Sequence, residues 1–127
     1  MAALAPDGRS LGHPGFDPVW KAAEQLQMAI GLHIVFHPHY VGNDWYRDRD
    51  PGFAFVSMNC PQDPRMALPT MVYGSVFERL PNLHVATIEA GGGWVAEWID
   101  RLDYRFSYVG HTSQMARPPS ETFERNL

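Results

Sequence analysis

The chain has 127 residues, of which 45% are hydrophobic and 13% aromatic, and this is enough apolar material for the core of one domain. The formal net charge is -4 and no run of Lys or Arg occurs, so we expect no nucleic-acid partner and no membrane partner. No apolar stretch approaches the roughly 18 residues that cross a bilayer, and the N-terminus lacks the pattern of a signal peptide. The single cysteine, Cys60, excludes an intramolecular disulfide, and together these features predict a cytoplasmic protein.

The first predicted helix begins at Asp17-Pro18, where a capping carboxylate precedes a proline that suits the first helical turn. Apolar residues follow at helical spacing and predict one buried face: Val19, Ala22, Ala23, Leu26 and Ile30. Gly31 then stands where a helix-ending glycine is common. The apolar run LHIVF, residues 32–36, predicts a strand buried on both faces.

Residues 38–69 form a long stretch without clear periodicity, and it contains five prolines and the polar cluster NDWYRDRD. A connection of this length is usually a functional loop or holds short helical pieces. We expect a second helix over residues 70–80, with Val72, Val76 and Leu80 on one face. The run LHVATI, residues 83–88, predicts a second buried strand.

A third helix is expected from about Trp94, and Ser120 is positioned to cap a short terminal helix. The apolar face of the third helix comprises Val95, Trp98, Ile99, Leu102 and Phe106. Strands separated by helices predict an α/β fold with a parallel sheet. Two parallel strands with three or more helices are too few for a closed barrel, which takes roughly 250 residues. The pattern therefore predicts part of a larger fold.

Three histidines lie at or beyond the first predicted strand, and alternate residues of a strand share a face. His37 is expected at the C-terminal end, where parallel sheets place active sites, and either binds a metal or hydrogen-bonds locally. His33, near the beginning of this strand, is expected to be a core or structural residue, as is His84 in the second strand. His39, after Pro38, is a candidate ligand, substrate contact or solvated loop residue.

Glu89 follows the second predicted strand directly and precedes the triplet Gly91-Gly92-Gly93. Its carboxylate is a candidate metal ligand or general base, or an acceptor for amides of the glycine loop. The structural alternative is that this carboxylate interacts favourably with the positive end of the dipole at the N-terminus of the next helix. The glycines allow a ligand close to the backbone but lack the G-x-G-x-x-G spacing of a dinucleotide site. Trp94 is expected mainly to pack.

Four stretches resemble a known family: FDPVWKAAEQL, FHP, YGSVFERLPNLHVATIEAGGGWVAEWIDRLD and ARPPSETFERN. Together they are similar to the amidohydrolase-related metal-dependent hydrolases, in the branch of aminocarboxymuconate-semialdehyde decarboxylase and resorcylate-type decarboxylases. The resemblance extends over residues 8–126. It implies a TIM-like (β/α) barrel with a divalent metal, most often zinc, at its C-terminal mouth. Residues 1–127 would then be a single segment from the middle of the barrel, around strands five and six.

The resemblance also implies roles for individual residues. His37 matches the metal-binding histidine of strand five, and Glu89 matches the end of strand six, where the decarboxylases carry a second histidine. Glu89 is thus both a metal and a catalytic candidate, while His39, Gly91 and Trp94 are candidates for substrate contact. The family's paired first-strand histidines and eighth-strand aspartate have no matching segments in this sequence. We therefore expect little or no catalysis from the isolated chain.

Three functions follow from these features. The first is a segment of a metal-dependent enzyme that hydrolyses or non-oxidatively decarboxylates a small carboxylic or carbonyl substrate. The second is a catalytically silent interaction protein derived from such an enzyme, whose open strand edges pair with a second copy or a complementary chain. The third is a small metal-binding domain that uses His37, His39 and Glu89.

Overall fold

A computed structural model describes residues 8–34 and 62–127 of the chain. Its elements in chain order are η1 (Pro14–Phe16), α1 (Asp17–Gln25), β1 (Ile30–His33), α3 (Gln62–Tyr73), α4 (Val76–Arg79), β2 (Val85–Ile88), α5 (Val95–Val109), η3 (Gly110–Thr112) and α6 (Pro119–Asn126). None of the helices in these two ranges is long and apolar enough to cross a membrane.

The two strands β1 and β2 pair in parallel, with a register that runs from Ile30 opposite Val85 to His33 opposite Ile88. The predicted α/β fold with a parallel sheet is confirmed. However, β1 begins two residues earlier than LHIVF, so Gly31 belongs to the strand and does not end a helix. Helix α1 ends at Gln25, and Gln27, with a φ of 53°, supplies the left-handed turn.

Helix α1 buries a different face from the predicted one. Trp20 and Ala23 are buried, whereas Val19 and Leu26 are 48% and 68% exposed. The indole Nε1 of Trp20 donates a hydrogen bond to the carbonyl of Leu11 at 3.1 Å, and this contact turns the helix toward the segment that precedes it.

Asp17 is the first residue of α1, and the N-cap position belongs to Phe16. The Asp17 carboxylate binds Arg79 of α4 through two hydrogen bonds of 2.8 and 2.9 Å. Arg79 also donates to the carbonyl of Gly74 at 2.7 Å. This bidentate ion pair joins two elements that are far apart in the sequence. Because Phe16 holds the N-cap position, the predicted capping role of Asp17 was wrong.

The helix expected over residues 70–80 is two helices, α3 and α4, and α3 begins at Gln62. Residues 62–69 were therefore wrongly assigned to an irregular connection, and Pro69 lies inside α3. The chain bends at Gly74 and Ser75, where Ser75 has a φ of 56°. A Cβ atom on Gly12 would overlap the carbonyl oxygen of Thr70, so the N-terminal segment crosses the end of α3 in backbone contact. The predicted apolar face holds across the bend, because Val72, Val76 and Leu80 are all buried.

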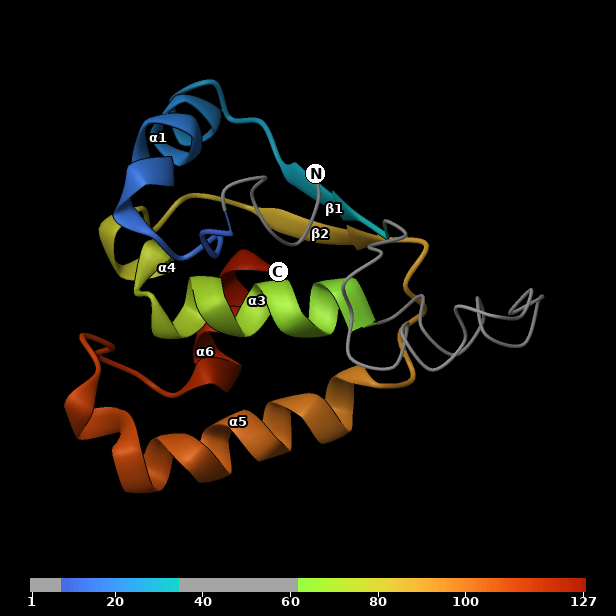
Figure 1. The fold of residues 1–127 in the computed structure, drawn as a ribbon, viewed down its shortest axis with the longest axis vertical. Helices are drawn as coiled ribbons and strands as arrows, with labels where there is room; N and C mark the ends of the chain where they lie inside the picture. Colours follow the sequence, from blue (N-terminus) through green and yellow to red (C-terminus); the bar gives the residue numbers. More distant parts are fainter. Residues whose placement is uncertain (1–7, 35–61) are drawn as a thin grey trace.

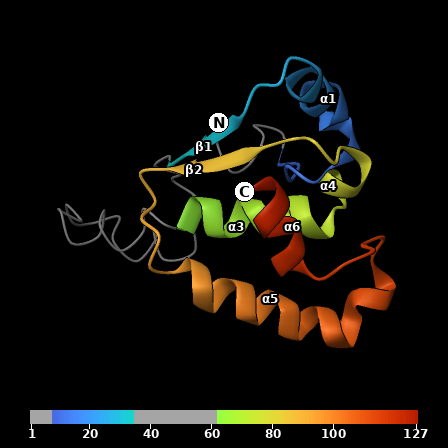
Figure 2. The same cartoon turned by 180° about the vertical axis from the view of Figure 1, so that it is seen from behind.

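The elements form layers, with α3 along one face of the sheet and α5 beyond α3 (Figures 1 and 2). The buried core between these layers includes Leu32 and Val85 from the sheet and Leu68, Met71 and Trp98 from the helices. The other face of the sheet carries Ala86 and Ile88, which are exposed within the described residues. Burial therefore alternates along the strands, in contrast to the expected burial on both faces.

Helix α5 begins one residue after Trp94, close to its predicted start, and buries Trp98 and Leu102 as expected. Helix α6 has Pro118 at its N-cap, so the predicted cap by Ser120 was wrong. Instead, the backbone N–H of Ser120 donates to Oδ1 of Asp103 at 2.9 Å, and this bond ties α6 to α5.

Candidate functional site

The C-terminal ends of the two strands bring an imidazole and a carboxylate together. His33 is the last residue of β1, Glu89 follows β2 directly, and Nε2 of His33 lies 3.5 Å from Oε2 of Glu89. The side chains are 47% and 64% exposed. His33 is 47% exposed and is the last residue of β1, which starts at Ile30, so the expected core position at the beginning of the strand was wrong.

The backbone at Glu89 explains how its carboxylate reaches His33. His33 lies opposite Ile88 in the parallel register and shares its face, and a regular strand would turn residue 89 to the opposite face. Glu89 instead has a φ of 63°, which breaks the alternation. A left-handed residue other than glycine costs about 1–3 kcal/mol, and such residues cluster at functional sites.

The hydrogen bond of the His33 ring indicates which nitrogen carries the proton in its neutral form. Nδ1 lies 2.8 Å from the carbonyl oxygen of Ile34, and a carbonyl only accepts, so Nδ1 carries a proton. In the neutral ring the lone pair therefore lies on Nε2, which faces Glu89. Metal-binding histidines commonly show this arrangement, in which one nitrogen donates to a carbonyl and the other is left for the metal.

The glycine loop after Glu89 is tied down by Trp94. Its indole Nε1 donates to the carbonyls of Ala90 and Gly91 at 2.9 and 3.0 Å, and its ring meets that of Trp98 edge-on at 5.8 Å. Gly91 has a φ of 61°, and a Cβ atom there would meet only open space. The packing role predicted for Trp94 is thus confirmed, and the loop beside Glu89 leaves room for another group.

The alternative, in which the Glu89 carboxylate stabilises the N-terminus of the next helix, was wrong. Helix α5 begins at Val95, six residues later, and the acidic residue of its first turn is Glu97. Glu97 accepts a hydrogen bond from Arg65 of α3 at 3.3 Å, and the Arg65 guanidinium lies 6.0 Å from the centre of the Trp94 ring. Sequence reasoning missed Arg65, since it lay in a stretch that was expected to be irregular.

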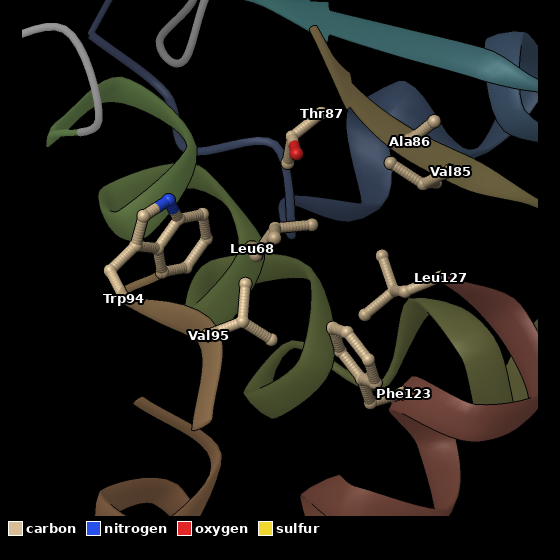
Figure 3. A pocket seen from close by; sticks show the side chains of 8 residues that line it. All are labelled: Leu68, Val85, Ala86, Thr87, Trp94, Val95, Phe123 and Leu127. Carbon is tan, nitrogen blue, oxygen red and sulfur yellow. The ribbon is translucent and has the colours of Figure 1, made fainter. Parts of the chain in front are cut away.

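A small apolar pocket of about 80 Å³ lies on the helix-covered side of the sheet. Figure 3 shows that its lining side chains come from β2, α3, the start of α5 and the end of α6. Thr87 is the one polar side chain among them, and the others are Leu68, Val85, Ala86, Trp94, Val95, Phe123 and Leu127. The pocket therefore lacks groups for acid–base or metal chemistry, and the candidate site is the pair at the strand ends.

The predicted residues His37, His39 and Cys60 lie outside the described residues. Within residues 8–34 and 62–127, no group of three or more His, Cys, Asp or Glu side chains is placed to hold a metal ion. The structure thus brings together Glu89, Gly91 and Trp94 around one loop, and it adds His33 to them.

Comparison with known proteins supports the family resemblance. A 2-amino-3-carboxymuconate-6-semialdehyde decarboxylase from Dictyostelium discoideum is 30% identical over 103 residues, which cover 80% of this chain and 26% of that protein. The resemblance to the amidohydrolase-related family is confirmed. No family model matches the sequence.

Two solved structures share the fold of this chain. An amidohydrolase from Mycobacterium avium subsp. paratuberculosis superposes with a TM-score of 0.78 at 24% identity, over 93% of this chain and 30% of its own. A 2,6-dihydroxybenzoate decarboxylase from Rhizobium superposes with a TM-score of 0.68 at 20% identity, over 97% of this chain and 39% of its own. These neighbours are TIM barrels, so the fold is part of a TIM-like (β/α) barrel. The chain spans about a quarter of the curated relative's length.

Proposed function

We propose that this chain is a segment of a metal-dependent amidohydrolase-related enzyme that hydrolyses or non-oxidatively decarboxylates a small carboxylic or carbonyl substrate. One observation carries the proposal: the Glu89 carboxylate lies half-exposed at the C-terminal ends of two parallel strands. Barrels of this type hold their active sites at that end. Two of the similar proteins are decarboxylases by name, which supports the substrate class.

In this proposal, the metal ligands from this chain are His37 and Glu89. The carboxylate oxygens of Glu89 are hard donors that suit a divalent ion such as zinc, and their exposure leaves them accessible. A bound divalent ion supplies Lewis acidity that polarises a substrate oxygen. Glu89 also acts as the general base or general acid that accepts or carries the proton transferred in the reaction. His39, Gly91 and Trp94 contact the substrate beside it.

Two protein ligands are fewer than the three or four that hold a catalytic zinc ion. We therefore propose that these 127 residues alone show little or no catalysis, and that activity needs further barrel strands. The test measures zinc in the purified chain and in His37→Ala and Glu89→Gln variants, with Glu97→Gln as the control carboxylate. Loss of bound zinc in the first two variants supports the proposal. Zinc retained at the same level in the His37→Ala and Glu89→Gln variants as in the unaltered chain refutes the proposed ligands.

A second candidate function is a catalytically silent protein that pairs with a second copy or a complementary chain. The specific observation is the sheet face that no described helix covers, where Ile88 is 43% exposed, together with exposed Leu26 and Met28 at the turn after α1. Light scattering after size-exclusion chromatography separates the candidates. A dimer that Ile88→Lys dissociates supports pairing, with Tyr104→Lys on exposed α5 as the control. A monomer at all concentrations contradicts it.

A further inference from the structure

The first turn of α3 meets the beginning of α5 beside the glycine loop through one residue, Arg65. Its guanidinium lies over the Trp94 ring, 6.0 Å from the ring centre, and donates a hydrogen bond to Oε2 of Glu97 at 3.3 Å. The backbone carbonyl of Arg65 accepts a hydrogen bond from the indole of Trp98 at 3.4 Å. A single residue of α3 therefore joins that helix to three residues at the start of α5.

Trp94 connects Arg65 to the loop that follows Glu89. The indole N–H of Trp94 is shared between the carbonyls of Ala90 and Gly91, at 2.9 and 3.0 Å. Ala90 is the residue next to Glu89, so this ring is bonded to the backbone that carries the candidate carboxylate. Figure 3 shows the Trp94 ring beside α3, the helix to which Arg65 belongs.

The glycine loop has few contacts within the described residues. Its three glycines, residues 91–93, are exposed, and a Cβ atom on any of them would meet nothing within 4 Å. The loop carbonyls bind the N–H of Val95 and the indole of Trp94. Glycine loses more backbone freedom on ordering than any other residue, so this loop needs such bonds to keep one conformation.

Electrostatics favours Arg65 as the group that holds the Trp94 ring. A guanidinium is attracted to the electron-rich face of an aromatic ring, and tryptophan is the best aromatic partner. The side chain of Arg65 is 33% exposed, so water weakens this attraction only in part. Glu97, which also accepts a hydrogen bond from Arg101 at 3.2 Å, orients the guanidinium through its own bond to Arg65.

We propose that Arg65 is a positioning residue of the candidate site, which acts through Trp94 to hold the glycine loop and the Glu89 carboxylate in place. The inference rests on the proposed function in its use of Glu89. It goes further because it assigns a role to a residue of α3, outside the strand ends and the loop that form the site. The contacts that carry it involve neither a metal nor a substrate.

The test measures backbone order in the full, metal-free chain by nitrogen-15 relaxation. We expect order parameters near 0.85 for residues 89–93 of the unaltered chain, and below about 0.6 in Arg65→Ala. The indole N–H of Trp94 should exchange with solvent about fivefold faster in this variant, the factor that corresponds to loss of one cation–π contact. The nuclear Overhauser effect between the side chains of His33 and Glu89 reports the carboxylate position and should weaken.

Three variants separate positioning from general stability. Arg65→Lys keeps a positive charge over the ring and should restore most of the loop order, whereas Arg65→Met fills similar space without charge and should not. Arg101→Ala is the matched control, because it removes the other partner of Glu97 and leaves Trp94 in place. Far-UV circular dichroism shows whether each variant folds, and Arg65→Met replaces Arg65→Ala if the alanine variant does not.

The outcomes decide between these roles. Loss of order confined to residues 89–94, with rescue by Arg65→Lys, supports the proposal. Unchanged order in Arg65→Ala overturns it, and so does an equal loss in Arg101→Ala or a loss that spreads through α3 and α5. Because no metal is added, these results are independent of the zinc measurements, which decide the proposed function on their own.

Discussion

Asn126, near the end of α6, joins the helix to the turn before β2 through a buried amide. Its side chain is 0% exposed, and Nδ2 donates to the carbonyls of Pro81 and Leu83 at 3.0 and 2.8 Å. Its Oδ1 atom accepts a hydrogen bond from Arg125 at 2.9 Å. The isosteric change Asn126→Asp keeps this accepted bond and removes both donated bonds.

The size of the effect follows from these bonds. Each buried carbonyl that loses its donor costs about 1–3 kcal/mol, so two lost donors cost about 4 kcal/mol. The new charge pair with the half-exposed Arg125 returns at most about 1 kcal/mol. We therefore expect Asn126→Asp to lower the free energy of unfolding by about 3 kcal/mol.

Urea denaturation, followed by circular dichroism and tryptophan fluorescence, measures this change. For a slope of about 2 kcal/mol per molar urea, the midpoint should fall by about 1.5 M. Glu124→Gln is the control, because Glu124 is exposed on the same helix and its midpoint should not move. A loss below about 1 kcal/mol in Asn126→Asp would show that the amide does not hold α6 in place.

Three further changes test other parts of the fold by the same urea assay. Gly12→Ala should cost about 2 kcal/mol or more, because its Cβ would overlap the backbone carbonyl of Thr70 and the backbone must shift. Glu89→Gly should raise stability by about 1 kcal/mol, because it removes the left-handed strain. Burial and the nearby Asp103 raise the pKa of Tyr73 above 10.0. The contribution of Tyr73 to the free energy of unfolding is therefore present below pH 10.0 and is lost as the pH rises through its folded-state pKa. We expect Tyr73→Phe to reduce this loss of stability at high pH.

Each of these predictions has a clear contrary result. Gly92→Ala serves as the control for Gly12→Ala, since a Cβ on Gly92 meets nothing within 4 Å. Equal losses of unfolding free energy in both variants would show that the close contact of Gly12 with the Thr70 carbonyl is not the cause. A less stable Glu89→Gly variant would mean that the His33 contact outweighs the strain. Identical pH profiles between pH 8 and 11 for the Tyr73→Phe variant and the unaltered chain would remove the assigned role of that hydroxyl.

Local patterns predicted the elements whose signals lie within a few residues. The strand LHVATI and the helix after Trp94 were found because their apolar residues lie close together in the sequence, although only one face of the strand is buried. The face of α1 was predicted wrongly because a distant contact, between Trp20 and Leu11, decides which side is buried. The break between α3 and α4 was missed for the same reason, since it depends on the crossing of Gly12 over α3.

The candidate site was predicted in part. Position alone identified Glu89, because a carboxylate directly after a buried strand is visible in the sequence. The pairing with His33 depends on the register between two strands and on a left-handed backbone at one residue. Neither the register nor the left-handed backbone has a local signature in the sequence. A correct prediction of the start of β1 at Ile30 would have placed His33 at the end of that strand.

The parallel pairing of β1 with β2 has a consequence for how the chain folds. Ile30 meets Val85, so the first contact of the sheet closes a loop of more than fifty residues. The loop-closure term of about 1.5RT ln n amounts to roughly 3.5 kcal/mol for a loop of that length. Helices α3 and α5 form from local contacts, so we expect them to form before the two strands pair. We then expect the contact between His33 and Glu89 to form late in folding.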